Sequence, residues 1–177
     1  MFLLTSTHGF PLGEHGTVGP ENAPLNTELV HVPLIARIPG RDAASFRLQS
    51  VCQPSTVYAT LSEWFGVVHE SELSLQSQSG AGSSSSRPVA VSQSSMQAAA
   101  VSIRTPAWHA IFHGSDGENV ELYVKPDDRW DFNEVAQRCP QIVRLLEEEL
   151  AQFQKAAKRE SFDELPPVAD SLVKWDE

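Results

Sequence analysis

The N-terminal part of the chain shows two apolar runs separated by polar loops. The first, 2–4, stops at a Thr-Ser-Thr-His-Gly turn, and the second, 30–38, is rich in Val and Ile and is followed by Pro39-Gly40. Short apolar runs that end in turn residues are typical of buried strands. We therefore predict two buried strands with a polar loop after the first.

A helix is predicted after the second strand, from Pro54 to Gly66. Proline suits the first turn of a helix, and glycine commonly ends one. The apolar residues of this segment fall on one face, which should pack on the second strand. They are Val57, Leu61 and Trp64 or Phe65.

Alternation with a period of two begins again at Val101. Apolar positions alternate in 107–112 and in 120–124, with a Gly-Ser-Asp-Gly turn at 114–117 between them, which predicts a short antiparallel sheet. His109 and His113 share one face of the first of these strands. They form either a metal-binding pair or a solvent-facing edge, and the edge is favoured because no third ligand lies nearby in the sequence.

An amphipathic helix should cover this sheet. Asp131 or Asn133 is suited to cap a short helix before it, and Pro140 marks a new first turn. Beyond Pro140 the apolar residues recur at helical spacing, with glutamates on the other side: Ile142, Leu146, Leu150 and Phe153. The apolar stripe is too short to favour a coiled coil.

A low-complexity segment divides the chain. Residues 71–97 are rich in Ser, Gln and Gly, a composition that buries too little surface to offset the entropy of ordering. The predicted organisation is the C-terminal part of an α/β domain at 1–70, a linker at 71–97, a small antiparallel sheet with a helix at 98–160, and a tail at 161–177.

Composition excludes some functions. The net charge of −10 disfavours nucleic acid as a partner, because its binding needs clustered Lys and Arg. No signal segment and no run of roughly 18 apolar residues occurs, so no membrane partner and, as the sequence is written, a cytoplasmic location are expected. Cys52 and Cys139 lack the spacing of a metal or disulfide framework.

The polar chemistry concentrates in the loop after the first strand, which holds His8, Glu14 and His15 among several glycines. Ligands of open α/β sheets bind beyond the carboxyl ends of the strands. Two imidazoles and a carboxylate can bind a divalent metal or transfer protons. The alternative is a polar surface loop whose histidines cap backbone groups, which the spacing alone favours because no HExxH or CxxC pattern occurs.

The same loop resembles a known family. Residues 5–9 (TSTHG), 12–16 (LGEHG) and 28–40 (ELVHVPLIARIPG) resemble the TSDHG, LGEHG and YEE-x-VRVPLI-x-R-x-PG motifs of the sulfatase family in the alkaline-phosphatase superfamily. Residues 53–67 resemble the helix that follows in that family, and 103–136 resemble its closing section. The resemblance follows the family's order and covers most of the chain outside 68–97.

The resemblance implies a metal centre. In that family the SDHG aspartate and the residue after it bind calcium or magnesium. His8 matches the second ligand position, whereas Thr7 stands at the aspartate position. Because a neutral hydroxyl is a weak ligand for a hard cation, we expect His8 to remain as a metal ligand with much reduced affinity.

Other groups of the family are missing here. No lysine precedes Lys125 to contact sulfate, and His31 stands where the family has the VRVP arginine. The family's nucleophile is a formylglycine made from Cys or Ser in a C/S-x-P-x-R motif, which lies far upstream, and neither cysteine of this chain is in such a motif. The loop is thus expected to lack fixed positive charge and to keep only titratable histidines. In an intact protein, the resemblance implies that His15 and His31 face the sulfate or its leaving group as donors or as an acid.

We therefore predict an α/β fold: the end of a sulfatase-like sheet plus a small antiparallel β subdomain with a C-terminal helix. The resemblance implies a sulfuric ester hydrolase acting on a sulfated small molecule or glycan, with the missing N-terminal half as a partner. The chain alone should be inactive. The alternatives are a non-catalytic, degenerate homologue and a protein-interaction module that uses the terminal helix.

Overall fold

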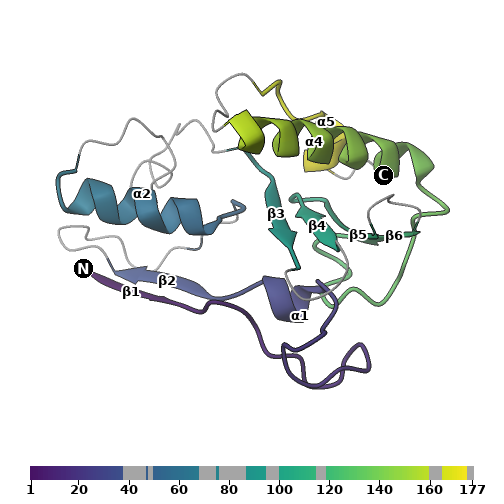
Figure 1. Ribbon diagram of the computed structural model, residues 1–177, viewed down its shortest axis with the longest axis horizontal. Helices are drawn as coiled ribbons and strands as arrows, with labels where there is room; N and C mark the ends of the chain where they lie inside the picture. The colour runs from purple at the N-terminus through teal and green to yellow at the C-terminus, as the bar shows by residue number, and fades with distance from the viewer. Residues whose placement is uncertain are drawn as a thin grey trace.

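The computed structural model describes residues 1–37, 47, 50–67, 75, 87–94, 100–114, 119–159 and 165–174. These residues form two parts (Figure 1). One contains a two-stranded sheet and a helix alongside it, and the other contains a four-stranded sheet beneath a long helix. Within the described ranges, no helix is both long and apolar enough to cross a lipid bilayer.

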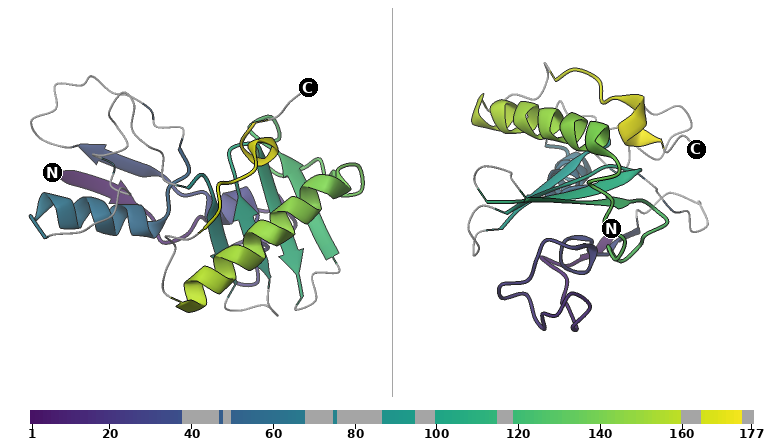
Figure 2. Two further views of the ribbon diagram at one scale, coloured as in Figure 1. Left: turned by 90° about the horizontal axis from the view of Figure 1, so that it is seen from above. Right: turned by 90° about the vertical axis from the view of Figure 1, so that its right-hand side faces the viewer.

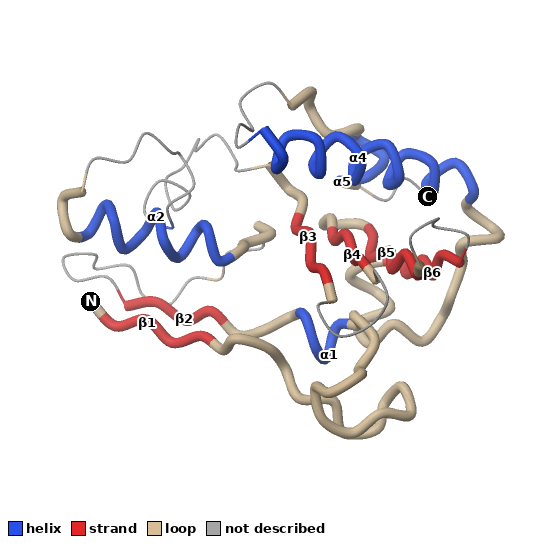
Figure 3. Tube along the Cα trace, in the orientation of Figure 1, coloured by secondary structure: helices blue, strands red, loops and turns tan. Residues whose placement is uncertain are grey.

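The two-stranded sheet consists of β1 (Phe2–Thr5) and β2 (Leu34–Arg37), which run antiparallel. The second strand is shorter than predicted, because Val30 ends the short helix α1 (Thr27–Val30) and 31–33 belong to no helix or strand; 38–40 lie outside the described residues. The strands were predicted to be buried, but Phe2, Leu4 and Ile35 are exposed. The described chain provides a helix, α2, along this sheet (Figures 1 and 3), and no second layer on the other side.

The helix α2 (Pro54–Trp64) begins and ends as predicted. Gln53 and Thr56 close a capping box at its start, and Gly66 follows its end with φ +70°, a conformation that suits glycine. The predicted apolar packing face is wrong, because the buried side chains are small: Thr56, Ala59, Thr60 and Ser62. Among them, Thr60 accepts the N–H of the buried residue Leu75 through Oγ1 at 2.9 Å.

The four-stranded sheet is antiparallel throughout, in the order β3-β4-β5-β6. Its strands are β3 (Ala90–Gln93), β4 (Val101–Arg104), β5 (Trp108–His113) and β6 (Asn119–Val124). The predicted antiparallel sheet is confirmed, although most of the predicted turn at 114–117 lies outside the described residues. The strand β3 lies within 71–97 and was not predicted, because Ala-Val-Ser-Gln pairs with β4 without a strong strand pattern of its own.

Both faces of the four-stranded sheet are covered (Figure 2). The long helix α4 (Pro140–Arg159) packs on one face through Ile142, Leu146 and Leu150, as predicted. The short helix α5 (Asp170–Val173) joins this side, where Leu172 is buried and the Trp108 indole donates to the Ser171 carbonyl at 2.8 Å. The other face packs against α1 and the N-terminal loop.

Candidate functional site

The N-terminal loop is held against the four-stranded sheet by α1. The Gly9 N–H donates to the Leu29 carbonyl at 2.8 Å. A Cβ on Gly9 would lie 1.8 Å from the Glu28 carbonyl oxygen, so only glycine fits this approach. Beneath α1, Leu25, Ile111 and Tyr123 form a small buried apolar cluster. The loop that carries the predicted site thus rests on strands β5 and β6.

His15 connects the loop to α1 and to the segment that follows β6. Its Nδ1 lies 2.5 Å from Glu28 Oε1 and its Nε2 lies 2.9 Å from the Asp131 carbonyl oxygen. The ring also stacks on Phe132, with 5.4 Å between the centroids. A carboxylate and a carbonyl only accept hydrogen bonds, so both ring nitrogens donate and the imidazole is protonated in this arrangement.

The surroundings of His15 favour that protonated form. Burial lowers the pKa of His15, but the hydrogen bonds to the Asp131 carbonyl and to Glu28 outweigh burial and raise the pKa above its ordinary value of 6.5. With both nitrogens engaged, His15 would have to release one partner before it contacted a substrate. In this geometry the role of His15 is structural: it holds the loop in place.

Asp131 is the buried centre of a polar network that the sequence analysis did not find. Its carboxylate accepts the Thr27 N–H at 2.6 Å, contacts His109 Nδ1 at 3.1 Å and pairs with Lys125 Nζ at 2.5 Å. Asp131 was predicted to cap a short helix next to it in the sequence. It instead accepts the first N–H of α1, which is brought to it by the fold.

The charges of this network are mutually stabilised. Burial raises the pKa of Asp131, but His109 and Lys125 outweigh burial and hold that pKa well below its usual range. Burial lowers the pKa values of both His109 and Lys125, and the Asp131 carboxylate opposes both shifts. The Nε2 atom of His109 is buried and has no hydrogen-bond partner in the described structure.

The favoured interpretation of His109 as part of a solvent-facing edge is wrong. His109 is fully buried, because α1 and the N-terminal loop cover its face of β5. His113 is partly exposed and its Nε2 lies 3.0 Å from Glu121 Oε1. The two histidines thus have separate carboxylate partners. An alternation pattern cannot reveal this difference, since the covering layer comes from a remote segment.

The residues predicted to bind a metal lie on the exposed part of the loop. His8 Nδ1 lies 2.8 Å from the Gly9 carbonyl, and the Glu14 carboxylate accepts the Leu12 N–H at 2.6 Å. Thr7 is exposed beside them. Among the described residues, no three His, Cys, Asp or Glu side chains are placed to hold a metal ion. One imidazole and one hydroxyl do not fit a complete calcium or magnesium site.

His31 lies at the C-terminal end of α1, where its N–H donates to the Thr27 carbonyl at 2.9 Å. Although the residue is exposed overall, partial burial of the ring lowers the pKa of His31. The positive charges of Arg104, Arg129 and Lys125 lower it further. His31 is consequently neutral near pH 7, and several cations act on it.

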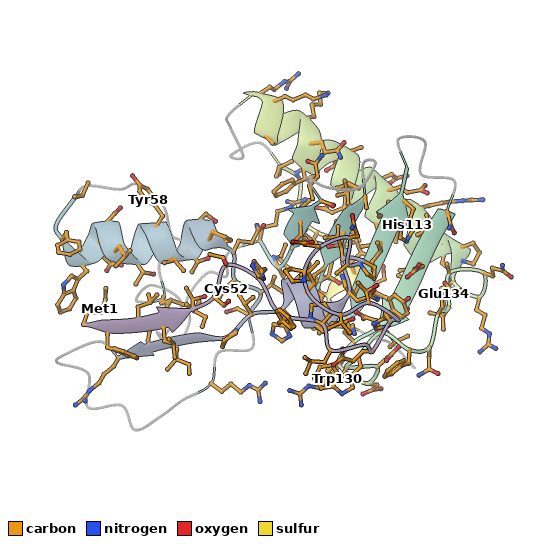
Figure 4. The ribbon with its side chains drawn as sticks, turned by 60° about the horizontal axis from the view of Figure 1, so that its bottom comes forward. Met1, Cys52, Tyr58, His113, Trp130 and Glu134 are labelled. Carbon is orange, nitrogen blue, oxygen red and sulfur yellow. The ribbon has the colours of Figure 1, made fainter. Side chains whose placement is uncertain are left out.

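These cations correct the expectation that the loop lacks fixed positive charge. Arg104 Nη1 and Lys125 Nζ both donate to Thr27 Oγ1, at 3.3 and 3.4 Å, while Arg129 lies over the Trp130 ring at 5.0 Å. Trp130 lies on the side of the molecule that carries the N-terminal loop (Figure 4). The charges come from the four-stranded sheet and its connections. Arg104 lies within 103–136, the stretch that resembles the family's closing section. That resemblance was the signal in the sequence that could have pointed to Arg104.

Comparison with known proteins found a similar structure but no matching sequence family. No family model matches the chain, and no curated protein matches it. The structure of BT4656 in complex with its substrate D-glucosamine-2-N,6-O-disulfate matches with a TM-score of 0.61 and 23% sequence identity. The match covers 86% of this chain and 34% of BT4656.

That likeness concerns the fold. It supports the predicted class, an α/β arrangement with a small antiparallel sheet and a C-terminal helix, which the described elements confirm. The chain spans about a third of the length of its neighbour, as the 34% coverage states. The chain thus has a sulfatase-like fold over the part that it shares with BT4656.

Proposed function

We propose that this chain is the C-terminal part of a sulfatase-like hydrolase that acts on sulfate esters of a small molecule or glycan. The observation that carries the proposal is the shared fold with BT4656, whose substrate carries two sulfate groups. The loop motifs at 5–9, 12–16 and 28–40 support it independently. The substrate class follows from these two observations together.

The charges around α1 suit such a substrate. A sulfate ester is an anion, and a site for it needs positive charge that is fixed before the substrate arrives. We assign this role to Arg104 and Arg129, which replace the missing lysine. His31, neutral near pH 7, is placed among them to exchange a hydrogen bond or a proton with the leaving group.

The two other histidines receive different roles in the proposal. His15 serves by positioning, because its bonds to Glu28 and Asp131 hold the 12–16 loop. His8 remains a candidate for a single metal ligand. The described residues do not complete a metal site, so no step of the reaction is derived through a metal.

The chain alone is proposed to be inactive. Neither Cys52 nor Cys139 lies in a C/S-x-P-x-R motif, so the nucleophile must come from the part of the fold that the chain does not span. The second candidate is a non-catalytic homologue, and the observation that favours it is Thr7 at the aspartate position.

The test starts with the protein isolated from its source. Its intact mass and a peptide map would show whether residues precede Met1 and whether a formylglycine is present. Sulfate release would then be measured from D-glucosamine-2-N,6-O-disulfate and from a simple aryl sulfate. We expect a longer chain with the aldehyde to release sulfate. An aldehyde-bearing protein that hydrolyses no sulfate ester would overturn the proposed activity, and a mass of 19.4 kDa would favour the non-catalytic homologue.

A further inference from the structure

The turn at 126–133 presents two aromatic rings to solvent from a backbone that is anchored on its inner side. Trp130 and Phe132 are 45% and 62% exposed, whereas Asp131 between them is buried and paired with Lys125. Asp131 has a φ of +60°, which is uncommon for a residue other than glycine and persists only where surrounding contacts hold it. The two aromatic side chains therefore flank one anchored residue.

A second carboxylate fixes the same turn. Asp128 accepts the N–H groups of Phe132 and Asn133 at 3.0 and 2.7 Å, and its own N–H donates to the Val124 carbonyl at 3.0 Å. The turn is thus ordered before any ligand arrives. Contact groups that are already ordered lose little conformational entropy on binding, which is why rigid aromatic side chains are common in binding sites.

The two rings have different neighbours. Phe132 stacks on His15 and so supports the loop at 12–16, whereas the Arg129 guanidinium lies over the Trp130 ring, 5.0 Å from its centroid. Trp130 projects on the side of the molecule that carries the N-terminal loop (Figure 4). An indole has a large apolar face, and its burial is favourable. A ligand that covers the exposed part of Trp130 would gain that free energy.

Trp130 lies within reach of the proposed site for the sulfate ester. The charge of Arg129 lowers the pKa of His31, while the guanidinium of the same residue lies over Trp130. Asp131 accepts the first N–H of α1, and His31 follows the last residue of α1; four helical residues rise only about 6 Å. A ligand that extends from His31 past Arg129 thus meets the indole with its next group.

The surroundings of Trp130 indicate the kind of ligand. A protein partner needs a wide apolar contact area, but the neighbours of Trp130 on this turn include exposed polar residues: Asp127, Arg129 and Asn133. A nucleic acid needs clustered Lys and Arg along its backbone, and 126–133 contains one arginine and three aspartates. A sugar ring combines a C–H face, which suits the negative face of an aromatic ring, with hydroxyl groups for polar neighbours.

We propose that Trp130 is a stacking platform for a second, uncharged sugar ring of the substrate, next to the sugar whose sulfate ester Arg104 and Arg129 receive. The inference rests on the proposed function and narrows its substrate class to a sulfated oligosaccharide. Trp130 is then a specificity-determining residue, because it contacts a part of the substrate that does not react.

The first test compares two probes on the protein at its natural length: D-glucosamine-2-N,6-O-disulfate, and the same sugar linked through C1 to galactose. Their dissociation constants are measured by surface plasmon resonance. We expect the linked probe to bind about tenfold more tightly, because the galactose ring stacks on the indole. Equal affinities for the two probes would overturn the proposal.

Variants of the turn assign that preference to one ring. Trp130→Leu should remove the preference for the linked probe, whereas Trp130→Tyr, which keeps an aromatic face, should retain most of it. Phe132→Leu is the matched control on the same turn, and it should keep the preference because that ring stacks on His15. A Trp130→Leu protein that still prefers the linked probe would refute the platform.

A second measurement needs no variant and so does not depend on how Trp130→Leu folds. Saturation-transfer NMR on the unaltered protein should show strong transfer from aromatic protons to the galactose ring protons, and no transfer would overturn the proposal. Sulfate release is then measured from both probes. Preference for the linked probe without sulfate release would remove the proposed activity alone, and sulfate release with equal kcat/KM for both probes would remove the platform alone.

Discussion

At the scale of single residues, Asp131 joins segments that are far apart in the sequence. Its carboxylate and the ammonium of Lys125 are both fully buried, and a buried charge is tolerated only where it is paired and hydrogen-bonded. The carboxylate also accepts the Thr27 N–H, and the backbone carbonyl of Asp131 accepts a hydrogen bond from His15. One residue thereby anchors α1 and the candidate site loop to the four-stranded sheet.

Asp131→Asn keeps the side-chain shape but removes the charge. Because Lys125 would remain buried without its partner, we expect a loss of roughly 3–5 kcal/mol in the free energy of unfolding, measured by urea denaturation. The control is Glu147→Gln on the exposed side of α4, for which a change within about 0.5 kcal/mol is expected. A loss for Asp131→Asn no larger than that of the control would contradict the assigned pairing.

His15 gives the loop a pH-dependent attachment. Its folded pKa is raised above 6.5, so the stabilisation from its bound proton is complete below pH 6.5 and is lost as the pH rises through the raised folded pKa. His15→Gln should therefore cost about 1–3 kcal/mol at pH 5.5 and less at pH 8.5, by urea denaturation at both values. The comparison variant is His8→Gln, which removes a contact local to the exposed loop. An equal cost of His15→Gln at both pH values would refute the ionic attachment.

At the scale of elements, α1 is too short to be stable alone. The conformational entropy lost in nucleating a helix exceeds the stabilisation from the hydrogen bonds of one turn. It forms where the Asp131 carboxylate accepts its first N–H and where Leu29 and Val30 pack beside Ile111 and Tyr123. The N-terminal loop then crosses it closely at Gly9. The element exists through contacts with the four-stranded sheet rather than through its own propensity.

Gly9→Ala tests that crossing. A Cβ would meet the Glu28 carbonyl oxygen at 1.8 Å, so the loop must shift and its hydrogen bond to Leu29 is lost. We expect a loss of about 1–3 kcal/mol or more, with increased hydrogen exchange of the Gly16 and Gly19 amides. Gly114→Ala serves as the contrast, since it strains a positive φ without a clash and should cost about 1–2 kcal/mol. Unchanged exchange in the loop of Gly9→Ala would contradict the close crossing.

At the scale of the whole molecule, the net charge of −10 conceals a local positive field. Arg104, Arg129 and Lys125 come from the C-terminal part of the chain and act on His31 in the N-terminal part. Coulomb interactions depend on distance through space rather than along the sequence. A candidate anion site therefore arises on an acidic protein only when the two parts come together.

The titration of His31 measures this field directly. Removing the exposed charge with Arg129→Gln should raise the pKa of His31 toward 6.5, observed by NMR titration of the ring protons, because that charge contributes to lowering it. Arg144→Gln, on the exposed side of α4, should leave the titration unchanged. Equal titration curves for the two variants would show that Arg129 does not act on this ring.

Local patterns along the chain were enough to locate several helices and strands. Proline at the start and glycine at the end defined α2, helical spacing of Ile142, Leu146 and Leu150 defined α4, and alternation defined β5 and β6. These features depend on neighbours along the chain. The motif order also indicated the sulfatase-like fold that the match to BT4656 supports.

Which polar residues are buried, and which charges act together, depends on the folded arrangement of the chain. In the folded chain His109 is buried beneath α1, and Asp131 pairs with Lys125. The strand β3 pairs with the edge of β4, and several cations act on His31. The burial of His109 and the charges that act on His31 require remote segments to meet, whereas the Asp131–Lys125 and β3–β4 pairs are closer in sequence but follow no periodic pattern. A periodic pattern records which face of an element is apolar, but burial, ion pairing and electrostatic fields depend on what the fold places opposite that face.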